Sequence, residues 1–231
     1  MKRLRKKFYE RNTIKVARDL LGKFLIRIIA RPHRQAKLGG QSKKKIIALI
    51  TETEAYHGPK DLASHASRGR TKRTEVMFGL AGRAYVYLIY GMYYCFNIVT
   101  GKENFPAAVL IRGVEIINNL KPKTYNQLIS GPGKVCRELK IDRSLNKENL
   151  LKSKKLFVVE DKKLLKKYYP QGFKIKIGKR VGVDYAGEYR NKPWRFILSC
   201  IGVGKGTKFC ASTKTPLQDK IKKPNIFKLD R

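Results

Sequence analysis

Two carboxylates stand two residues apart inside an otherwise apolar stretch. Residues 50–58 read ITETEAYHG, so Glu52 and Glu54 are followed at the same spacing by Tyr56. In a β-strand these three side chains share a face. A buried carboxylate beside an aromatic ring can have a raised pKa and act as a general acid or base. The alternative is a strand carboxylate that faces water or pairs with an arginine, and the pattern does not choose between Glu52 and Glu54.

A second stretch is rich in tyrosine. Residues 83–100 read RAYVYLIYGMYYCFNIVT, two β-prone runs joined at Tyr90-Gly91-Met92. Bulky aromatics around a glycine-containing turn are typical of a β-hairpin, whose apolar strands we expect to be mostly buried and whose tip we expect at the surface. Such tyrosines usually form a core. Together with a carboxylate and a basic surface, they also suit a flipped base, which needs stacking platforms and a positioned water.

The charge balance favours a polyanionic partner. Lys and Arg number 53 against 17 Asp and Glu, a formal net charge of +36. A charge of this size favours nucleic acid, with binding that weakens steeply as salt rises. A solvated lysine-rich surface is the alternative. No run approaches the roughly 20 apolar residues of a membrane span, and no apolar segment follows the basic start. We therefore expect an intracellular protein without a membrane partner.

The remaining candidate ligands are isolated residues. The four cysteines show no C-x-x-C pair, so we expect no zinc, no iron–sulfur cluster and no cofactor. Arg112 interrupts an apolar run and is expected to pair with a carboxylate. His65 alone is typical of a hydrogen-bonded structural residue. Pro132 indicates a helix start, where Lys134 could help to seat a phosphate, and an ordinary capped helix is an equal alternative.

The elements that position these residues form a mixed pattern. Besides the hairpin, strands are expected at 23–30, 46–56, 107–116, 156–160, 174–183 and 194–201, and helices at 8–20 and after a turn within 128–141. They do not alternate as βαβ units, so we predict one α+β domain over 1–231 with a mainly antiparallel sheet. The basic loop 32–45 and the tail 205–231 are expected to be flexible, and 142–173 is lysine-rich without clear pattern.

Several motifs in this order resemble the alkyladenine (3-methyladenine) DNA glycosylase family. They are ARDLLGK, ETEAY, GPxDxASHxxRGRT, MFG, YVYxIYGMYYCFNIV, AAVLIRGVE, SGPGKVCREL and RVGVDYAGE followed by KPWRF. The resemblance runs from about Ala17 to about Phe196. It implies a single α+β domain with a curved antiparallel sheet, surrounding helices and a protruding hairpin that intercalates into DNA.

The resemblance also assigns catalytic roles. Glu54 matches the general base, which activates the water that attacks C1′ of the damaged nucleotide. Arg112 and the backbone carbonyl of Val181 match the groups that hold this water. Because a carboxylate rather than a lysine occupies the base position, we expect no Schiff base and no strand cleavage.

The resemblance places the damaged base among aromatic and polar side chains. Tyr56, His65 and Tyr87 match the base pocket, where rings stack on the flipped base and the histidine contacts its edge or sugar-phosphate. Asn97 matches the asparagine at the pocket floor that disfavours the exocyclic amine of guanine.

The hairpin tip is assigned to the DNA duplex. Tyr90 matches the residue that intercalates through the minor groove. Met92, Tyr93 and Lys134 are expected to contact DNA nearby.

The expected activity is base-excision repair. A monomer would flip 3-methyladenine, 7-methylguanine, ethenoadenine or hypoxanthine from double-stranded DNA and leave an abasic site without a metal, in a bacterial cytoplasm, or in a nucleus if the source is eukaryotic. One alternative is a noncatalytic nucleic-acid-binding protein, which explains the charge and tyrosines but gives no reason for Glu54 and Arg112 in apolar strands. Another is a glycosylase scaffold that has lost activity, against which the intact Glu54 and Arg112 count.

Overall fold

Apolar runs along the chain pair into one sheet. The structure, a computed structural model, describes residues 1–30, 43–117 and 127–201. Within these ranges the strands are β1 (Lys2–Arg3), β2 (Phe24–Ala30), β3 (Lys43–His57), β4 (Ala84–Ile89), β5 (Tyr93–Val99), β6 (Ala107–Ile116), β7 (Gln127–Ser130), β8 (Leu156–Glu160), β9 (Phe173–Gly178) and β10 (Arg195–Cys200). The helices are α1 (Lys6–Tyr9), α2 (Thr13–Leu20), α3 (Pro132–Glu138) and α4 (Lys162–Tyr168), with 3-10 turns η2 (His65–Arg68), η3 (Glu75–Phe78), η4 (Arg143–Leu145) and η5 (Gly187–Asn191).

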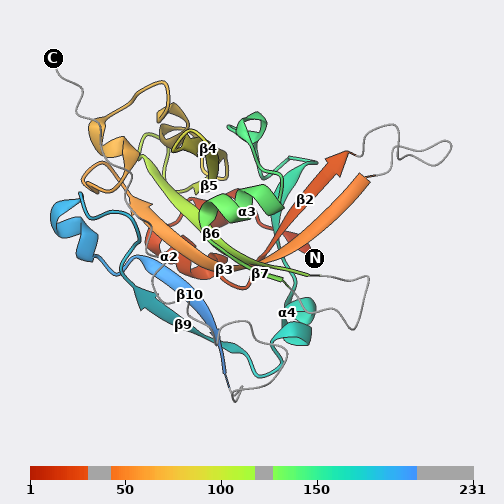
Figure 1. Cartoon of the computed structure of the whole chain (residues 1–231). Coiled ribbons are helices and arrows are strands. Elements are labelled where there is room, and N and C mark those ends of the chain that lie inside the picture. Colours follow the sequence, from red (N-terminus) through yellow and green to blue (C-terminus); the bar gives the residue numbers. More distant parts are fainter. Residues whose placement is uncertain (31–42, 118–126, 202–231) are drawn as a thin grey trace.

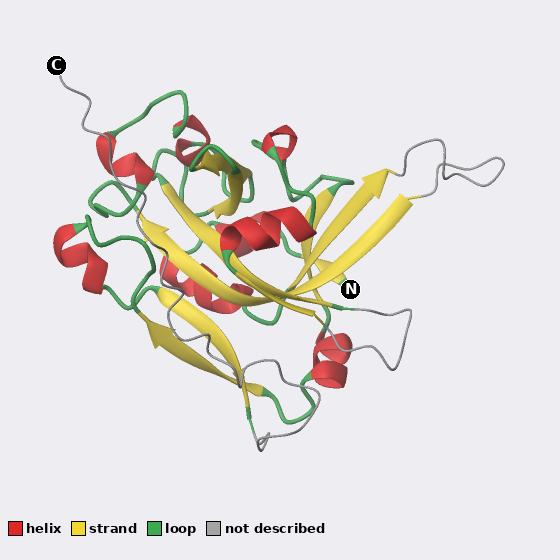
Figure 2. Cartoon of the chain, in the orientation of Figure 1, coloured by secondary structure: helices red, strands yellow, loops and turns green. Residues whose placement is uncertain are grey.

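The long strand β3 connects the parts of the sheet. The main order is β1-β8-β2-β3-β6-β5-β4, with β7 added to β6 and β10 pairing with both β3 and β9. The strand pairs are antiparallel. β2 and the first part of β3 extend as an arm on one side, and helices are few beside the strands (Figures 1 and 2). The predicted α+β fold with a mainly antiparallel sheet is confirmed.

Helix α2 covers one face of β3. Its buried residues include Val16, Ala17 and Leu20, which recur at helical spacing and pack into the main hydrophobic core. The carbonyl of Ala17 accepts a hydrogen bond from Thr53 Oγ1 at 2.8 Å. Because side chains alternate along a strand, Glu52 and Glu54 lie on the face opposite to this helix.

The predicted helix over 8–20 is wrong as a single element. It is divided into α1 and α2 by residues 10–12. The side chain of Asn12 accepts hydrogen bonds from the backbone N–H groups of Ile14 and Lys15, so it caps the first turn of α2. A local capping residue therefore starts a new helix inside an uninterrupted apolar pattern.

Other boundaries also differ from the predictions. β3 begins at Lys43 rather than at 46, because Lys43–Lys45 pair with the end of β2 while their side chains stay exposed. β9 ends at Gly178, so Val181 lies in a loop, and 127–130 is strand β7 rather than a turn. The 142–173 segment contains α4, which the Asp161 side chain caps at the N–H of Leu164. Residues 32–42 and the tail 205–231 lie outside the described residues.

Strands β4 and β5 form the predicted hairpin. The ends of β4 and β5 that lie away from the turn are buried, and burial decreases toward the tip. Tyr90 and Gly91 both have positive φ, 52° and 71°, and the N–H of Met92 donates to the carbonyl of Ile89 at 3.2 Å. Two central residues with positive φ define a type I′ turn, whose twist suits a tight hairpin.

Candidate active site

The sheet register aligns residues from five strands in one row, two of which, Glu54 and Asn97, are predicted site residues. Arg195 is paired with Glu54, Glu54 with Leu110, Leu110 with Asn97, and Asn97 with Tyr85. Directly paired residues of antiparallel strands share a face. One row across β10, β3, β6, β5 and β4 therefore carries a carboxylate, an amide and a phenol on the face opposite to α2.

Glu54 is a fully buried carboxylate with defined partners. Its side chain is 0% exposed. Oε1 accepts the backbone N–H of Val181 at 3.0 Å, and Oε2 accepts the hydroxyl of Tyr56 at 3.1 Å. The Nε of Arg112 is 3.6 Å from Oε1. Burial raises the pKa of Glu54, and the Arg112 charge and the two hydrogen bonds oppose this shift.

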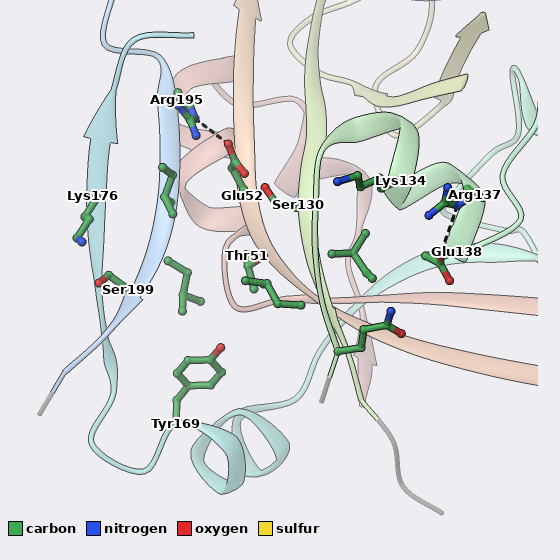
Figure 3. Close-up of a pocket in the computed structure, with 16 residues that line it drawn as sticks. Thr51, Glu52, Ser130, Lys134, Arg137, Glu138, Tyr169, Lys176, Arg195 and Ser199 are labelled. Atoms are coloured by element: carbon green, nitrogen blue, oxygen red, sulfur yellow. Dashed lines mark hydrogen bonds and ion pairs between the residues drawn. The ribbon is translucent and has the colours of Figure 1, made fainter. Parts of the chain in front are cut away.

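Glu52 occupies a different setting from Glu54. Its Oε1 accepts Nε–H groups from Arg112 at 2.8 Å and from Arg195 at 2.7 Å. The predicted pairing of Arg112 with a carboxylate is confirmed. Glu52 and Arg195 also lie at one end of a cavity of about 590 Å³ between β9–β10 and β7–α3, which Lys134 also lines (Figure 3). Of the two carboxylates, Glu54 is thus the one enclosed by protein, and Glu52 borders the cavity.

A buried ion pair organises the loop beside Glu54. The guanidinium of Arg180 binds both oxygens of Asp61, at 2.6 and 2.8 Å, and both side chains are 0% exposed. Arg180 also donates to the carbonyls of Ala55 and Tyr189. Arg180 thus links β3 to the loop in which Val181 donates its backbone N–H to Glu54.

Arg180 also fixes the ring of Tyr56. Its guanidinium carbon lies 4.8 Å from the centre of the Tyr56 ring and 5.0 Å from that of Trp194. Cation–π contact of this kind orients an aromatic ring and restricts its rotation. Two contacts therefore direct the Tyr56 hydroxyl toward Glu54: the Arg180 guanidinium over its ring and its own hydrogen bond to the carboxylate.

An aromatic cluster lies along the same face of the sheet. The Tyr85 and Tyr87 ring centres are 5.1 Å apart, and the imidazole of His65 contacts the Tyr87 ring edge-to-face at 4.6 Å. His65 Nδ1 is 2.9 Å from the hydroxyl of Tyr85. The buried amide of Asn97 donates from Nδ2 to the carbonyl of Tyr85, which fixes its orientation. Arg73 covers the Tyr87 ring with its guanidinium carbon 5.0 Å from the ring centre.

The hairpin tip is exposed and apolar. Tyr90, Met92 and Tyr93 are 83%, 66% and 48% exposed. Positive φ is unfavourable for a tyrosine, so a local conformational cost accompanies the exposure of the Tyr90 ring. Gly133 at the start of α3 lies close to the Tyr93 side chain, because an added Cβ would be 3.1 Å from Tyr93 Cβ. The exposed, aromatic tip and the basic start of α3 are thus neighbours.

The arrangement favours water chemistry on a base-sized aromatic ligand. It combines a buried carboxylate, an arginine and two adjacent phenol rings. Among the described residues, no group of three His, Cys, Asp or Glu side chains could hold a metal ion. No helix within the described ranges is long and apolar enough to cross a membrane.

Comparison with known proteins identifies the family. The family model described as Methylpurine-DNA glycosylase matches residues 7–200. A relative from Methanocella arvoryzae, named "Putative 3-methyladenine DNA glycosylase", is 48% identical over 197 residues, covering 82% of this chain and 88% of its own length. Relatives of the same name from Desulfitobacterium hafniense and Legionella pneumophila are 44% and 46% identical, each over 86% of this chain and over 96% and 95% of their own lengths. The chain belongs to the methylpurine-DNA glycosylase family.

Membership of this DNA glycosylase family gives the reaction class. The chain is a hydrolase of base-excision repair whose substrate is DNA. The resemblance seen in the sequence motifs is confirmed.

The structure of this glycosylase brings most predicted site residues together. Tyr56, Arg112 and Val181 each contact Glu54. His65, Tyr87 and Asn97 join through Tyr85. The tip residues Tyr90 and Met92 form a separate, exposed group, and Lys134 is exposed in the first turn of α3.

Four residues of the candidate site were not predicted. They are Asp61, Tyr85, Arg180 and Arg195. All four lie within motifs that resemble the family, which was the available signal. Arg195 follows Trp194 at the start of a predicted strand, and nothing local indicates that it reaches Glu52.

We expect the imidazole of His65 to titrate far below neutral pH. Burial, together with the charges of Arg73 and Arg68, lowers its pKa from 6.5 to about 4. Because the folded pKa lies below the unfolded one, His65 stays neutral at pH 7, and its contribution to stability is lost as pH falls from 6.5 through about 4. NMR titration, with His65→Gln for assignment, measures this directly. A His65 pKa near 6.5 would contradict the buried, cation-flanked environment.

Proposed function

We propose that this glycosylase hydrolyses the N-glycosidic bond of damaged purines in duplex DNA, with Glu54 as the general base. The proposed substrates are 3-methyladenine, 7-methylguanine, ethenoadenine and hypoxanthine. The observation that carries the proposal is the Glu54 carboxylate, which is fully buried beside a ring cluster and has a raised pKa. Such a carboxylate accepts a proton more readily than an exposed one.

The proposed step uses water as the nucleophile. The water oxygen bonds to C1′ as the bond from C1′ to the purine nitrogen breaks, the bonding electrons leave with the base, and Glu54 accepts the water proton. Arg112 and the Val181 carbonyl hold the water. The hydrogen bond from the Val181 N–H to Glu54 supports this role, because it fixes the same residue's backbone beside the carboxylate. The products are a free base and an abasic site, and no Schiff base forms.

The proposed base pocket is formed by Tyr56, His65, Tyr87 and Asn97. Alkylated purines such as 3-methyladenine carry positive charge, and phenol rings attract such bases by roughly 0.5–2 kcal/mol. A positively charged base is also a better leaving group. Asn97 lies in the pocket floor, and its donated hydrogen bond to Tyr85 keeps the amide from rotating.

The hairpin tip is proposed to replace the flipped nucleotide in the DNA stack. Tyr90 would insert its exposed ring, while Met92, Tyr93 and Lys134 contact the duplex around it. Inserting a side chain between base steps costs a few kcal/mol, and less at a damaged pair, which gives selectivity. We propose that a monomer acts on the duplex.

Replacing Tyr90 by glycine should lower base release from DNA while leaving the stability of the fold unchanged. Glycine relieves the positive φ of 52°, and this gain is offset by the larger entropy of the unfolded chain, so thermal stability should stay near wild type. Loss of the ring should lower single-turnover base release roughly 10- to 100-fold, because the vacated stack is unfilled. Release kinetics and thermal unfolding of the same samples measure both effects.

Lys147→Gly is a matched control for the Tyr90 variant. Lys147 is another exposed residue with positive φ, 67°. Its replacement changes the backbone in the same way without removing an aromatic ring. Equal loss of base release in both variants would count against an intercalating role for Tyr90.

The proposed reaction is tested by product analysis. Single-turnover reactions on duplexes that each contain one of the four lesions would be divided, and half of each treated with alkali. We expect free base from at least one lesion, with strand breaks only after alkali. Breaks without alkali would indicate lyase chemistry, and no base from any lesion by a protein that binds DNA would overturn the proposal.

A further inference from the structure

Glu52 holds two arginines at the edge of the site. Its Oε1 is 2.8 Å from Nε of Arg112 and 2.7 Å from Nε of Arg195. The same Nε of Arg112 is 3.6 Å from Oε1 of Glu54. Nε carries a single N–H, which makes its short hydrogen bond to one acceptor. That bond goes to Glu52 and not to Glu54.

The backbone is shaped to admit Glu52 at this position. The register pairs Glu52 with Gly113 and then Thr53 with Ile111, so Arg112 is skipped in an irregularity of the β3–β6 ladder. Such irregularities re-aim side chains beside active sites. A Cβ at residue 113 would lie 2.8 Å from Cβ of Glu52, so only glycine leaves this space.

We propose that Glu52 is a positioning residue, which holds Arg112 by its Nε and keeps the guanidinium from closing onto Glu54. The inference rests on the proposed role of Glu54 as general base. A carboxylate in a close pair with arginine binds a proton weakly and has its lone pairs occupied, so it is a poor base. By taking the Nε–H, Glu52 leaves Arg112 near enough to hold a water but leaves the Glu54 oxygens free of a short arginine contact.

The groups around Glu54 define what each substitution does. Glu54 faces Glu52 and Tyr56 from its own strand, Arg112 from β6, Cys95 from β5, and Arg195 from β10. The loop after β9 supplies only the backbone N–H of Val181, because Arg180 is bound to Asp61.

Removing the charge of Glu52 should shift the acid limb of the pH–rate profile to lower pH. In Glu52→Gln a negative neighbour is lost and Arg112 can close onto Glu54, and both changes favour the ionised form of Glu54. The acid limb of the single-turnover rate should shift by roughly 0.5–1 unit to lower pH, and the plateau should fall roughly 10- to 100-fold.

Removing Arg195 should move the profile the other way. Arg195→Gln deletes a positive charge and leaves Glu52 bound to Arg112 alone. The acid limb should move to higher pH, with a smaller loss at the plateau. A merely structural role for either residue would lower the rate without moving the acid limb.

The test compares the full-length protein and its Glu52→Gln, Arg195→Gln and Glu54→Gln variants across pH 4.5–9. The substrate is the duplex whose lesion the wild type releases fastest among hypoxanthine, ethenoadenine and 7-methylguanine. Acid limbs that move in opposite directions support the inference, and an unmoved limb in Glu52→Gln overturns it. Wild-type activity in Glu54→Gln would instead overturn the proposed base. If Glu52→Gln does not fold, Arg195→Gln carries the test, and a limb that stays or moves to lower pH overturns the inference.

Discussion

Glu54→Gln should reduce single-turnover base release roughly 10²–10⁴-fold, the range that a general base contributes. Glutamine keeps an oxygen that can accept the Val181 N–H, and its amide nitrogen can donate to the Tyr56 hydroxyl, so the site geometry is retained. What is lost is the ability to take a proton from water. Rates measured with enzyme in excess over a lesion-containing duplex, together with DNA affinity, check this.

The same substitution should make the fold more stable at neutral pH. Burial raises the pKa of Glu54 above its ordinary 4.5. The protonated carboxyl therefore contributes stability in full below pH 4.5, and this contribution is lost as pH rises through the folded pKa. Glutamine does not ionise, and the stability advantage of Glu54→Gln should grow as pH rises. Denaturant unfolding at several pH values measures the trend.

Glu115→Gln is the matched control for Glu54→Gln. Glu115 is also a buried strand carboxylate, 4% exposed, and accepts the Tyr169 hydroxyl at 2.6 Å. Glu115 has no proposed part in the reaction, so the rate of base release by Glu115→Gln should stay close to that of the wild type. Equal activity of wild type and Glu54→Gln would move the base role elsewhere.

Arg180→Met should destabilise the fold by about 3–5 kcal/mol, because it leaves the Asp61 carboxylate buried without its cation. Asp61 would keep only the backbone N–H groups of His57 and Ala63. The Ala55 and Tyr189 carbonyls would each lose the hydrogen bond from Arg180, and the Tyr56 ring would lose its cation. We expect both the free energy of unfolding, measured with denaturant, and the rate of base release to fall in the same variant.

The Arg11–Asp19 pair provides a control of the same chemistry. It is equally short, 2.7 Å, but its side chains are 40% and 46% exposed. Arg11→Met should therefore cost only about 0–1 kcal/mol. The double variant Asp61→Leu with Arg180→Met should recover part of the lost stability, because no unpaired charge remains. Base release should stay low in it, since Val181 and Tyr56 are no longer held; full recovery of release would contradict a positioning role.

The choice between Glu52 and Glu54 shows where the sequence pattern stopped. Both carboxylates fit the alternation of an apolar strand, and the pattern gave them equal standing. The family resemblance assigned the base role to Glu54, and the structure shows how the two settings differ. Arg195 comes to Glu52 from β10, whereas Val181 brings its N–H to Glu54 from a loop. The pairing of Arg112 with a carboxylate was predictable from its apolar run, but the identity of the partner was not.

The sequence by itself determined most of the strands, the tyrosine hairpin, the basic character and the motifs of the family, since each depends on neighbouring residues or on composition; β1 and β7 were not predicted. The tertiary structure decided the site. The row from Arg195 to Tyr85 depends on the register of five strands. The Asp61–Arg180 pair joins residues 119 positions apart. Such contacts depend on how distant segments pack, because burial and register set which side chains meet, and no local pattern encodes them.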